Sequence, residues 1–213
     1  MAEFYGGVEE FLSEERSDGK ITVKSRLRFK KSTFLCTDEY CGTAEGMLVT
    51  SRLHCEKGHG DLPRFGKCYR LDRGFDSVSY LGRAGETYCD MRDHFPIKRV
   101  HCTVQDMTEP NIRPQESGNR MDCQYVTLSN GRDTVTFTAV DKPFELAVKP
   151  YSDAELAAMK HREDERASGT YVTIQAFQMG IGTGSCGPAT RKEYRFDRRK
   201  DYEISYLISW NKE

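Results

Sequence analysis

Hydrophobic and polar residues alternate along several stretches of the chain, which is the pattern of β-strands with one buried face. In residues 21–29, ITVKSRLRF, the isoleucine, valine, leucine and phenylalanine fall on one face and basic or hydroxyl residues on the other. The same alternation recurs in FELAVKP (144–150), TYVTIQAF (170–177) and YEISYLISW (202–210). Gly and Pro separate these stretches, so we expect a series of strands joined by turns.

A hairpin is predicted in residues 122–140, DCQYVTLSNGRDTVTFTAV. Two alternating runs meet there at Asn130-Gly131, a dipeptide that accepts positive φ at both centres of a two-residue turn. The sequence therefore predicts a tight hairpin at this point.

One helix is predicted, in residues 151–164. Ser152 is placed to cap the helix and Glu155 to reach back to it, and the apolar residues Leu156, Ala157 and Met159 follow. With this single helix among many strands, the predicted fold class is all-β, and no linker or repeat divides residues 1–213, which we treat as one domain.

The spacing of Cys36, Cys41, His54 and His59 falls within the pattern of a two-cysteine, two-histidine zinc finger. A finger would need a helix before His54, yet MLVTSRLH alternates and contains β-branched residues. We therefore expect the two cysteines to flank a hairpin turn, DEYCGTAEG, and we predict no metal site and no cofactor.

Composition narrows the class of protein. The 32 Lys and Arg residues balance 33 Asp and Glu residues, for a net charge of -1, which argues against a nucleic-acid partner. We read the basic runs RLRFKK and RFDRRK as solvated strand faces. No run approaches the ~18 apolar residues of a membrane span, and the acidic N-terminus lacks a signal core. Eight cysteines then suggest reduced thiols in a cytoplasmic protein.

No self-sufficient active site is evident in the sequence. Acidic residues are scattered rather than paired as glycoside hydrolysis requires, and no nucleophile motif accompanies a histidine. The stretch MGIGTGSCGP (179–188) is rich in glycine but lacks the lysine of a phosphate-binding loop. It is either a long turn between strands or a loop that completes a ligand pocket.

Several motifs in order resemble one family. IRPQESGNRMDCQYVTL, KPFELAVKPYSDAELAAMKHRED and MGIGTGSCGPATRKEYRF are similar to the C-terminal region of the large β-galactosidases of glycoside hydrolase family 2, called the small chain or fifth domain. Upstream, LPRFGKCYRLDRGFDSVSYLGRAGETYCDMR resembles two further segments of that family. The resemblance covers roughly residues 45–213 and is weaker from about residue 8.

The resemblance implies an antiparallel β-supersandwich shared with galactose mutarotases. It also implies that the catalytic glutamates lie outside this chain, that the chain docks on the remaining domains or a large subunit, and that a homo-oligomer can form. The glycine-rich loop would contact the galactoside through Gly182, Ser185 and Cys186. Many family members have Trp at the position of Cys186, and a thiol offers much less stacking area than an indole.

In the segment LGRAGETYCDMR, Gly82, Glu86, Tyr88, Asp90 and Arg92 match the family pattern, although the family's Gly-Pro is absent. Either these residues contact sugar or they form a hydrogen-bonded turn that pins two strands. The family domain would begin with more strand sequence, so we expect an N-terminally truncated piece with an unpaired sheet edge.

Two rival functions stay open. A sugar mutarotase would require His94 or His101 beside a carboxylate, and a stand-alone carbohydrate-binding module would bind sugar without a partner. In the stretch RPQESGNR we expect a structural pair between Glu116 and Arg120.

Overall fold

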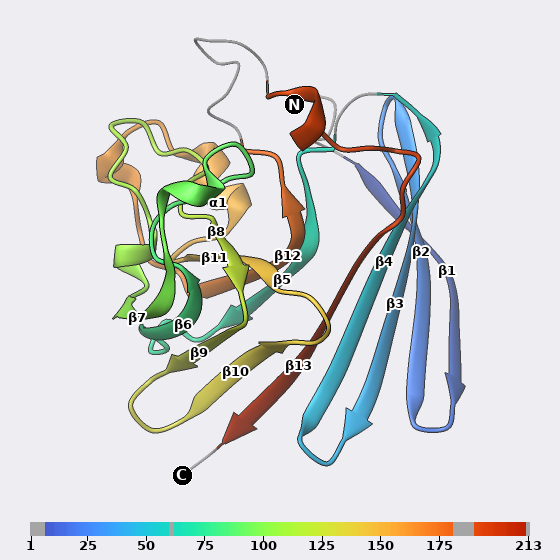
Figure 1. Ribbon diagram of the computed structural model, residues 1–213, viewed down its shortest axis with the longest axis horizontal. Helices are drawn as coiled ribbons and strands as arrows, with labels where there is room; N and C mark the ends of the chain where they lie inside the picture. Colours follow the sequence, from blue (N-terminus) through green and yellow to red (C-terminus); the bar gives the residue numbers. More distant parts are fainter. Residues whose placement is uncertain (1–6, 60–61, 181–189, 212–213) are drawn as a thin grey trace.

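The computed structural model describes residues 7–59, 62–180 and 190–211, and these form two antiparallel sheets (Figure 1). The strands of the larger sheet are, in spatial order, β1 (Val8–Ser17), β2 (Lys20–Arg28), β3 (Ser32–Thr43), β4 (Gly46–Gly58), β13 (Tyr202–Asn211), β10 (Thr134–Ala139), β9 (Tyr125–Ser129), β6 (Ser77–Arg83) and β7 (Ile97–Thr103). The strands of the smaller sheet are β5 (Arg64–Leu71), β12 (Thr170–Gln178), β11 (Phe144–Lys149) and β8 (Arg120–Cys123). The all-β prediction is confirmed.

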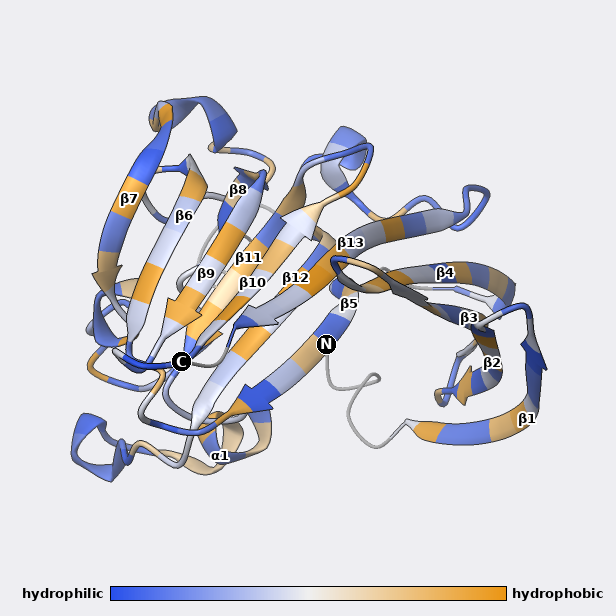
Figure 2. Cartoon of the chain, turned by 90° about the horizontal axis from the view of Figure 1, so that it is seen from below, coloured by the Kyte–Doolittle hydropathy of each residue, from blue (hydrophilic) through white to orange (hydrophobic). Residues whose placement is uncertain are grey.

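A core fills the space between the two sheets. Hydrophobic and hydrophilic residues alternate along many of the strands, as the striped colouring in Figure 2 shows, and successive side chains of a strand point to opposite faces of its sheet. Phe144, Leu146 and Val148 of β11 face Phe137 and Tyr206 of the larger sheet, and each is at most 1% exposed. This burial of large side chains is the main source of stability for the two layers.

A second apolar cluster lies where β3 and β4 meet the start of β5. Phe34, Leu53 and Phe65 are buried in it together with Phe196, which precedes β13. Phe34 and Phe196 pack edge to face with ring centroids 5.9 Å apart. This cluster fixes the strand β5 against the larger sheet.

The hairpin predicted around Asn130-Gly131 is present, but its turn is longer than expected. Strands β9 and β10 pair from Ser129 with Thr134, which leaves four residues in the connection. Only Gly131 has positive φ, at +86°. The Asn130 side chain instead accepts hydrogen bonds from the backbone of Arg132, at 2.9 Å, and of Asp133. The expectation of positive φ at both centres was wrong because the asparagine caps the turn.

The predicted hairpin at the cysteines is confirmed as β3 and β4, paired from Ser32 with Gly58 to Thr43 with Gly46. Cys36 lies opposite Leu53 on the buried face, whereas His54 lies opposite Leu35 and points outward. Burial raises the pKa of Cys36 to about 12, so its thiol stays protonated. Strand pairing thus separates the four side chains: Cys36 is on the buried face, Cys41 and His54 are on the other face opposite Leu48 and Leu35, and His59 follows the end of β4.

The predicted helix forms as α1 (Asp153–Ala158) with the expected capping box. The Ser152 hydroxyl accepts from the Glu155 backbone, and the Glu155 carboxylate accepts from the Ser152 backbone at 2.7 Å. The helix is shorter than predicted, because Met159 is extended and His161 precedes a separate 3-10 turn, η4 (Arg162–Asp164). The other 3-10 turns in the described part of the chain are η2 (Arg92–His94), η3 (Gln105–Met107) and η5 (Lys192–Tyr194).

The two basic runs, RLRFKK and RFDRRK, differ in secondary structure. Arg26 and Arg28 lie on the solvated face of β2, as predicted. Arg26 pairs with Glu56 of β4, two strands away, and Arg28 with Glu10 of the adjacent β1. Residues 195–200 form no strand and precede β13, so the strand prediction was wrong there. Within the three described ranges, no helix has the length and apolar character needed to cross a membrane.

Candidate functional site

The candidate site lies over the outer face of the smaller sheet, where the loop from residue 84 to residue 96 folds against residues 117–122. The Thr87 backbone donates to the Asn119 carbonyl at 2.8 Å, and its hydroxyl accepts from the Met121 backbone at 2.9 Å. Thr87 and Asn119 are fully buried. Around Tyr88, the segment LGRAGETYCDMR (81–92) therefore forms a hydrogen-bonded turn, which is one of the two alternatives drawn from the sequence.

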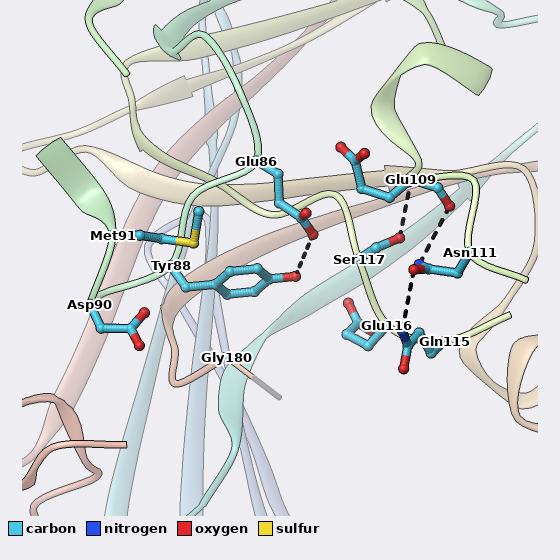
Figure 3. A pocket seen from close by; sticks show the side chains of 10 residues that line it. All are labelled: Glu86, Tyr88, Asp90, Met91, Glu109, Asn111, Gln115, Glu116, Ser117 and Gly180. Atoms are coloured by element: carbon cyan, nitrogen blue, oxygen red, sulfur yellow. Dashed lines mark hydrogen bonds between the residues drawn. The ribbon is translucent and has the colours of Figure 1, made fainter. Parts of the chain in front are cut away.

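Glu86 and Tyr88 of this turn line a pocket of about 320 Å³ together with Glu109, Asn111 and Ser117 (Figure 3). The Glu86 carboxylate accepts hydrogen bonds from the Tyr88 hydroxyl at 3.0 Å and from the backbone of Gly118 at 2.8 Å. Burial, followed by the neighbouring Glu86 charge, raises the pKa of Tyr88. Its phenol therefore stays protonated and keeps donating to Glu86.

Gly118 makes this arrangement possible. Its φ is +82°, and a Cβ there would lie 2.1 Å from the Met107 carbonyl oxygen. Only glycine fits such a position without strain. The turn that it forms aims its backbone N–H at Glu86.

The carboxylates at this pocket are Glu86, Asp90, Glu109 and Glu116, and no basic side chain lines it among the residues described there. Glu116 does not pair with Arg120 as predicted. It accepts instead from Lys149 at 2.6 Å and from Arg64 at 3.3 Å. Arg120 begins β8 and is only 5% exposed, with its Nη1 donating to the Asn119 carbonyl.

The pocket reaches the start of the glycine-rich loop. Gly180 lines it, with φ of +79°, and a Cβ there would lie 3.3 Å from the Tyr88 ring. The Cys89 thiol approaches the carbonyls of Met179 at 3.5 Å and Tyr194 at 3.9 Å, one on each side of the loop. Gly182, Ser185 and Cys186, predicted to contact sugar, lie outside the described residues.

A second pocket of about 430 Å³ adjoins the first through Asp90 and Met91, and Arg92 and His94 line it. Arg92 binds both oxygens of Asp122, at 2.8 and 2.5 Å. Asp122 also accepts from Arg83 at 2.8 Å. Burial opposes ionisation of Asp122, but the two arginines keep its pKa below the usual value. Arg92 is thus paired with Asp122 within the chain. Gly82 packs closely against Cys123, because a Cβ on Gly82 would lie 2.6 Å from the Cys123 sulfur.

A buried polar network supports both pockets from below. The Asn119 amide donates to Glu145 at 2.7 Å and accepts from Gln175 at 3.0 Å. Burial raises the pKa of Glu145 to about 7. Sequence analysis missed Glu145, because it reads as an ordinary outward position of an alternating strand.

The two histidines considered for a mutarotase, His94 and His101, have no hydrogen bond to a carboxylate among the described side chains. His101 contacts the Ser79 hydroxyl at 2.7 Å on an exposed edge, and His94 lies in η2 with no carboxylate hydrogen bond among the described side chains. His54 does contact Asp201, at 2.7 Å, but both are more than half exposed on the outer face of the larger sheet. In residues 7–59, 62–180 and 190–211 no cluster of three or more His, Cys, Asp or Glu could hold a metal.

The fold places the chain in a structural class, and the sequence then places it in a family. It is similar to a galactose mutarotase-like protein from Lactobacillus casei ATCC 334, with a TM-score of 0.54 and 13% identity over 95% of this chain and 73% of that chain. At this identity the likeness shows the fold alone. The family follows from the sequence match: the chain belongs to the beta galactosidase small chain family, which matches residues 6–208.

Curated relatives agree with this assignment. The chain is 34% identical to a β-galactosidase of Staphylococcus xylosus over 151 residues, which are 70% of this chain and 15% of the relative. It is 28% identical to a β-galactosidase of Lactobacillus delbrueckii subsp. bulgaricus over 202 residues, covering 92% of this chain and 20% of the relative. The chain therefore matches only a minor part of the length of these relatives.

Proposed function

We propose that residues 1–213 form a noncatalytic domain of a cytoplasmic β-galactosidase of glycoside hydrolase family 2. In the complete enzyme, which hydrolyses terminal β-galactosides, this domain packs on the remaining domains and closes one side of the sugar site. Its own polypeptide supplies binding surface rather than the reacting carboxylates.

The observation that carries this proposal is the family match over residues 6–208 of a chain that covers only 15 to 20% of its relatives. The remaining four-fifths or so of such an enzyme is ample for a separate catalytic domain. This coverage supports a catalytic domain that lies outside these residues.

The described carboxylates support the noncatalytic role. Glycoside hydrolysis needs one protonated carboxyl group and one carboxylate facing the same sugar. Glu86 is held by Tyr88 and a backbone N–H, and Glu116 by two cations. Glu145, whose pKa is raised, is buried beneath the pockets rather than lining the two described above.

The pocket chemistry suits a sugar. Hydroxyl groups of a galactoside can donate to carboxylate and amide oxygens such as those of Glu109, Asn111 and Gln115. The pocket begins at Gly180, directly before the loop that holds Gly182, Ser185 and Cys186. We propose that this loop extends the pocket toward the galactoside.

An assay of the purified chain with o-nitrophenyl galactoside tests the proposal. We expect no turnover above buffer, and turnover that copurifies with the chain would overturn the noncatalytic role. Titration calorimetry with galactose and lactose at millimolar concentration should show no heat. Saturable heat without any partner would mean a free carbohydrate-binding module instead.

A further inference from the structure

Thr87 lies between two residues whose side chains line the candidate pocket, Glu86 and Tyr88 (Figure 3). Thr87 itself is fully buried and lines neither that pocket nor the adjoining one. Whatever fixes Thr87 also sets the directions in which its two neighbours enter the pocket, because the three residues share one stretch of backbone.

Three hydrogen bonds hold Thr87 against residues 119–121. Its backbone N–H donates to the Asn119 carbonyl at 2.8 Å, and its carbonyl accepts from the Asn119 side-chain amide at 2.9 Å. Its hydroxyl accepts from the backbone N–H of Met121 at 2.9 Å. Only this third bond depends on the side chain of Thr87, and its loss would leave a buried N–H without its acceptor, which is costly.

The same network reaches a second wall of the pocket. The Asn119 amide donates its other hydrogen to Glu145 at 2.7 Å, and Glu145 also accepts from the backbone of Gln178. Gln178 ends β12 two residues before Gly180, which lines the pocket. A continuous buried chain of hydrogen bonds, Thr87–Asn119–Glu145–Gln178, thus joins two of the stretches of backbone that form the pocket.

The loop is held separately on either side of Thr87. Arg83, before it, and Arg92, after it, both bind Asp122. Loss of the Thr87 hydroxyl would therefore loosen the middle of the loop while its two flanks stay attached. The middle is the part that faces the pocket.

We propose that Thr87 is a positioning residue for galactoside binding: its hydroxyl holds the loop on Met121 and so keeps Glu86 and Tyr88 in the geometry that the sugar meets. This inference rests on the proposed function, in which the pocket belongs to one side of the sugar site. Thr87 touches no sugar and acts through its neighbours. Contacts of this kind bind the substrate and the transition state alike, so their loss raises KM and leaves kcat nearly unchanged.

Two substitutions at Thr87 and one control separate positioning from stability. Thr87→Val replaces the hydroxyl with a methyl group, and Thr87→Ser restores the hydroxyl. The control is Thr170→Val in β12. Thr170 is only 2% exposed, its hydroxyl donates to the Phe75 carbonyl at 3.1 Å, and it lines neither pocket of the candidate site. Circular dichroism and urea unfolding establish that each variant folds and how much stability it has lost.

The kinetic measurement adds each chain in excess to the Staphylococcus xylosus β-galactosidase with the region that matches this chain deleted, and determines KM and kcat for o-nitrophenyl galactoside. We expect Thr87→Val to raise KM at least about tenfold and to keep kcat within about twofold. Thr87→Ser should stay within about threefold of the parent KM, because it keeps the hydrogen bond to Met121. Thr170→Val should have the parent KM despite a similar loss of stability.

A second readout uses the chain alone. The Gly118 backbone N–H donates to the Glu86 carboxylate at 2.8 Å, so its hydrogen exchange reports where Glu86 lies. We expect the Gly118 amide to exchange at least about tenfold faster in Thr87→Val than in the parent, and at the parent rate in Thr87→Ser.

An active complex in which Thr87→Val keeps the parent KM would overturn the inference, and so would an unchanged exchange rate of Gly118. An equal rise in KM for Thr170→Val would overturn it too, because KM would then follow stability. If Thr87→Val does not fold, Tyr88→Phe takes its place: removing the phenol that donates to Glu86 should raise KM, and an unchanged KM would refute the positioning. These outcomes leave the proposed function standing, whereas a parent chain that restores no activity would overturn both.

Discussion

Replacing Glu145 with glutamine should stabilise the chain at mildly alkaline pH and change it little at acidic pH. Glu145 accepts from Asn119 at 2.7 Å and lies directly across from Gln175 in the strand pair. The side-chain amide oxygen of Gln175, Oε1, is buried without a partner among the described groups. A protonated Glu145, or a glutamine in its place, can donate to that oxygen, whereas a carboxylate cannot.

The size of the effect follows from the pKa of Glu145. Burial, opposed by the hydrogen bonds from Asn119 and Gln178, raises it from 4.5 to about 7. Between these pH values the folded chain holds a proton that the unfolded chain has released, so the free energy of unfolding falls as pH rises. Each pH unit corresponds to ~1.4 kcal/mol, which gives a loss of about 3 kcal/mol that is complete above the folded-state pKa.

Urea unfolding of the chain and of Glu145→Gln at about pH 5 and about pH 8 measures this effect. We expect the variant to exceed the parent by about 3 kcal/mol at the higher pH and by under about 1 kcal/mol at the lower pH. Glu203→Gln, at an exposed position of β13, is the control and should show no such dependence. An equal difference at both pH values would refute a protonated Glu145.

Three further tests, two of them with a control substitution, probe the packing by urea unfolding. Gly118→Ala should lower the free energy of unfolding by well over 2 kcal/mol, and its control Gly131→Ala by about 1 kcal/mol. Both glycines have positive φ, but only at Gly118 would a Cβ collide with a backbone carbonyl. Equal losses of stability in the two variants would contradict this reasoning. Lys149→Met should cost about 3 kcal/mol by removing one of the two cations that pair with the largely buried Glu116 carboxylate, against almost nothing for exposed Lys142→Met. Ser152→Ala should lower the free energy of unfolding by about 1 kcal/mol through loss of the helix cap. An unchanged free energy of unfolding would show that the cap does not stabilise the chain.

Sequence alternation was enough to predict the strands that became β11, β12 and β13, since each has one face in the central core. It could not predict their partners. Strand β13 pairs with β4 and β10, from distant parts of the chain, and such pairing depends on the whole sheet.

The outer face of β11 shows a second limit of prediction from sequence alternation. Alternation predicts that Glu145 and Lys149 are solvated, yet every residue of β11 is buried. The loops that carry Glu86 and Glu116 cover that face, and local sequence contains no signal for such a cover. The same loops redirect Glu116 to Lys149, because Gly118 reverses the chain before Arg120 can approach.

The candidate site was predicted in part. The sequence identified the segment LGRAGETYCDMR (81–92) and the glycine-rich loop as candidates. The structure brings Glu86, Tyr88 and Gly180 to one pocket. Asn111, Gln115 and Ser117 were not singled out, since polar loop residues carry no periodicity that would distinguish them. The roles of Gly182, Ser185 and Cys186 stay predictions.

The central claim is that this chain completes an enzyme whose reacting carboxylates lie elsewhere. The most direct measurement titrates the chain into the Staphylococcus xylosus β-galactosidase that lacks the matching region and records o-nitrophenyl galactoside hydrolysis. We predict that each polypeptide alone is inactive and that activity rises with added chain to a plateau. Activity that depends on this chain alone, or a mixture that binds no chain and stays inactive, would contradict the account.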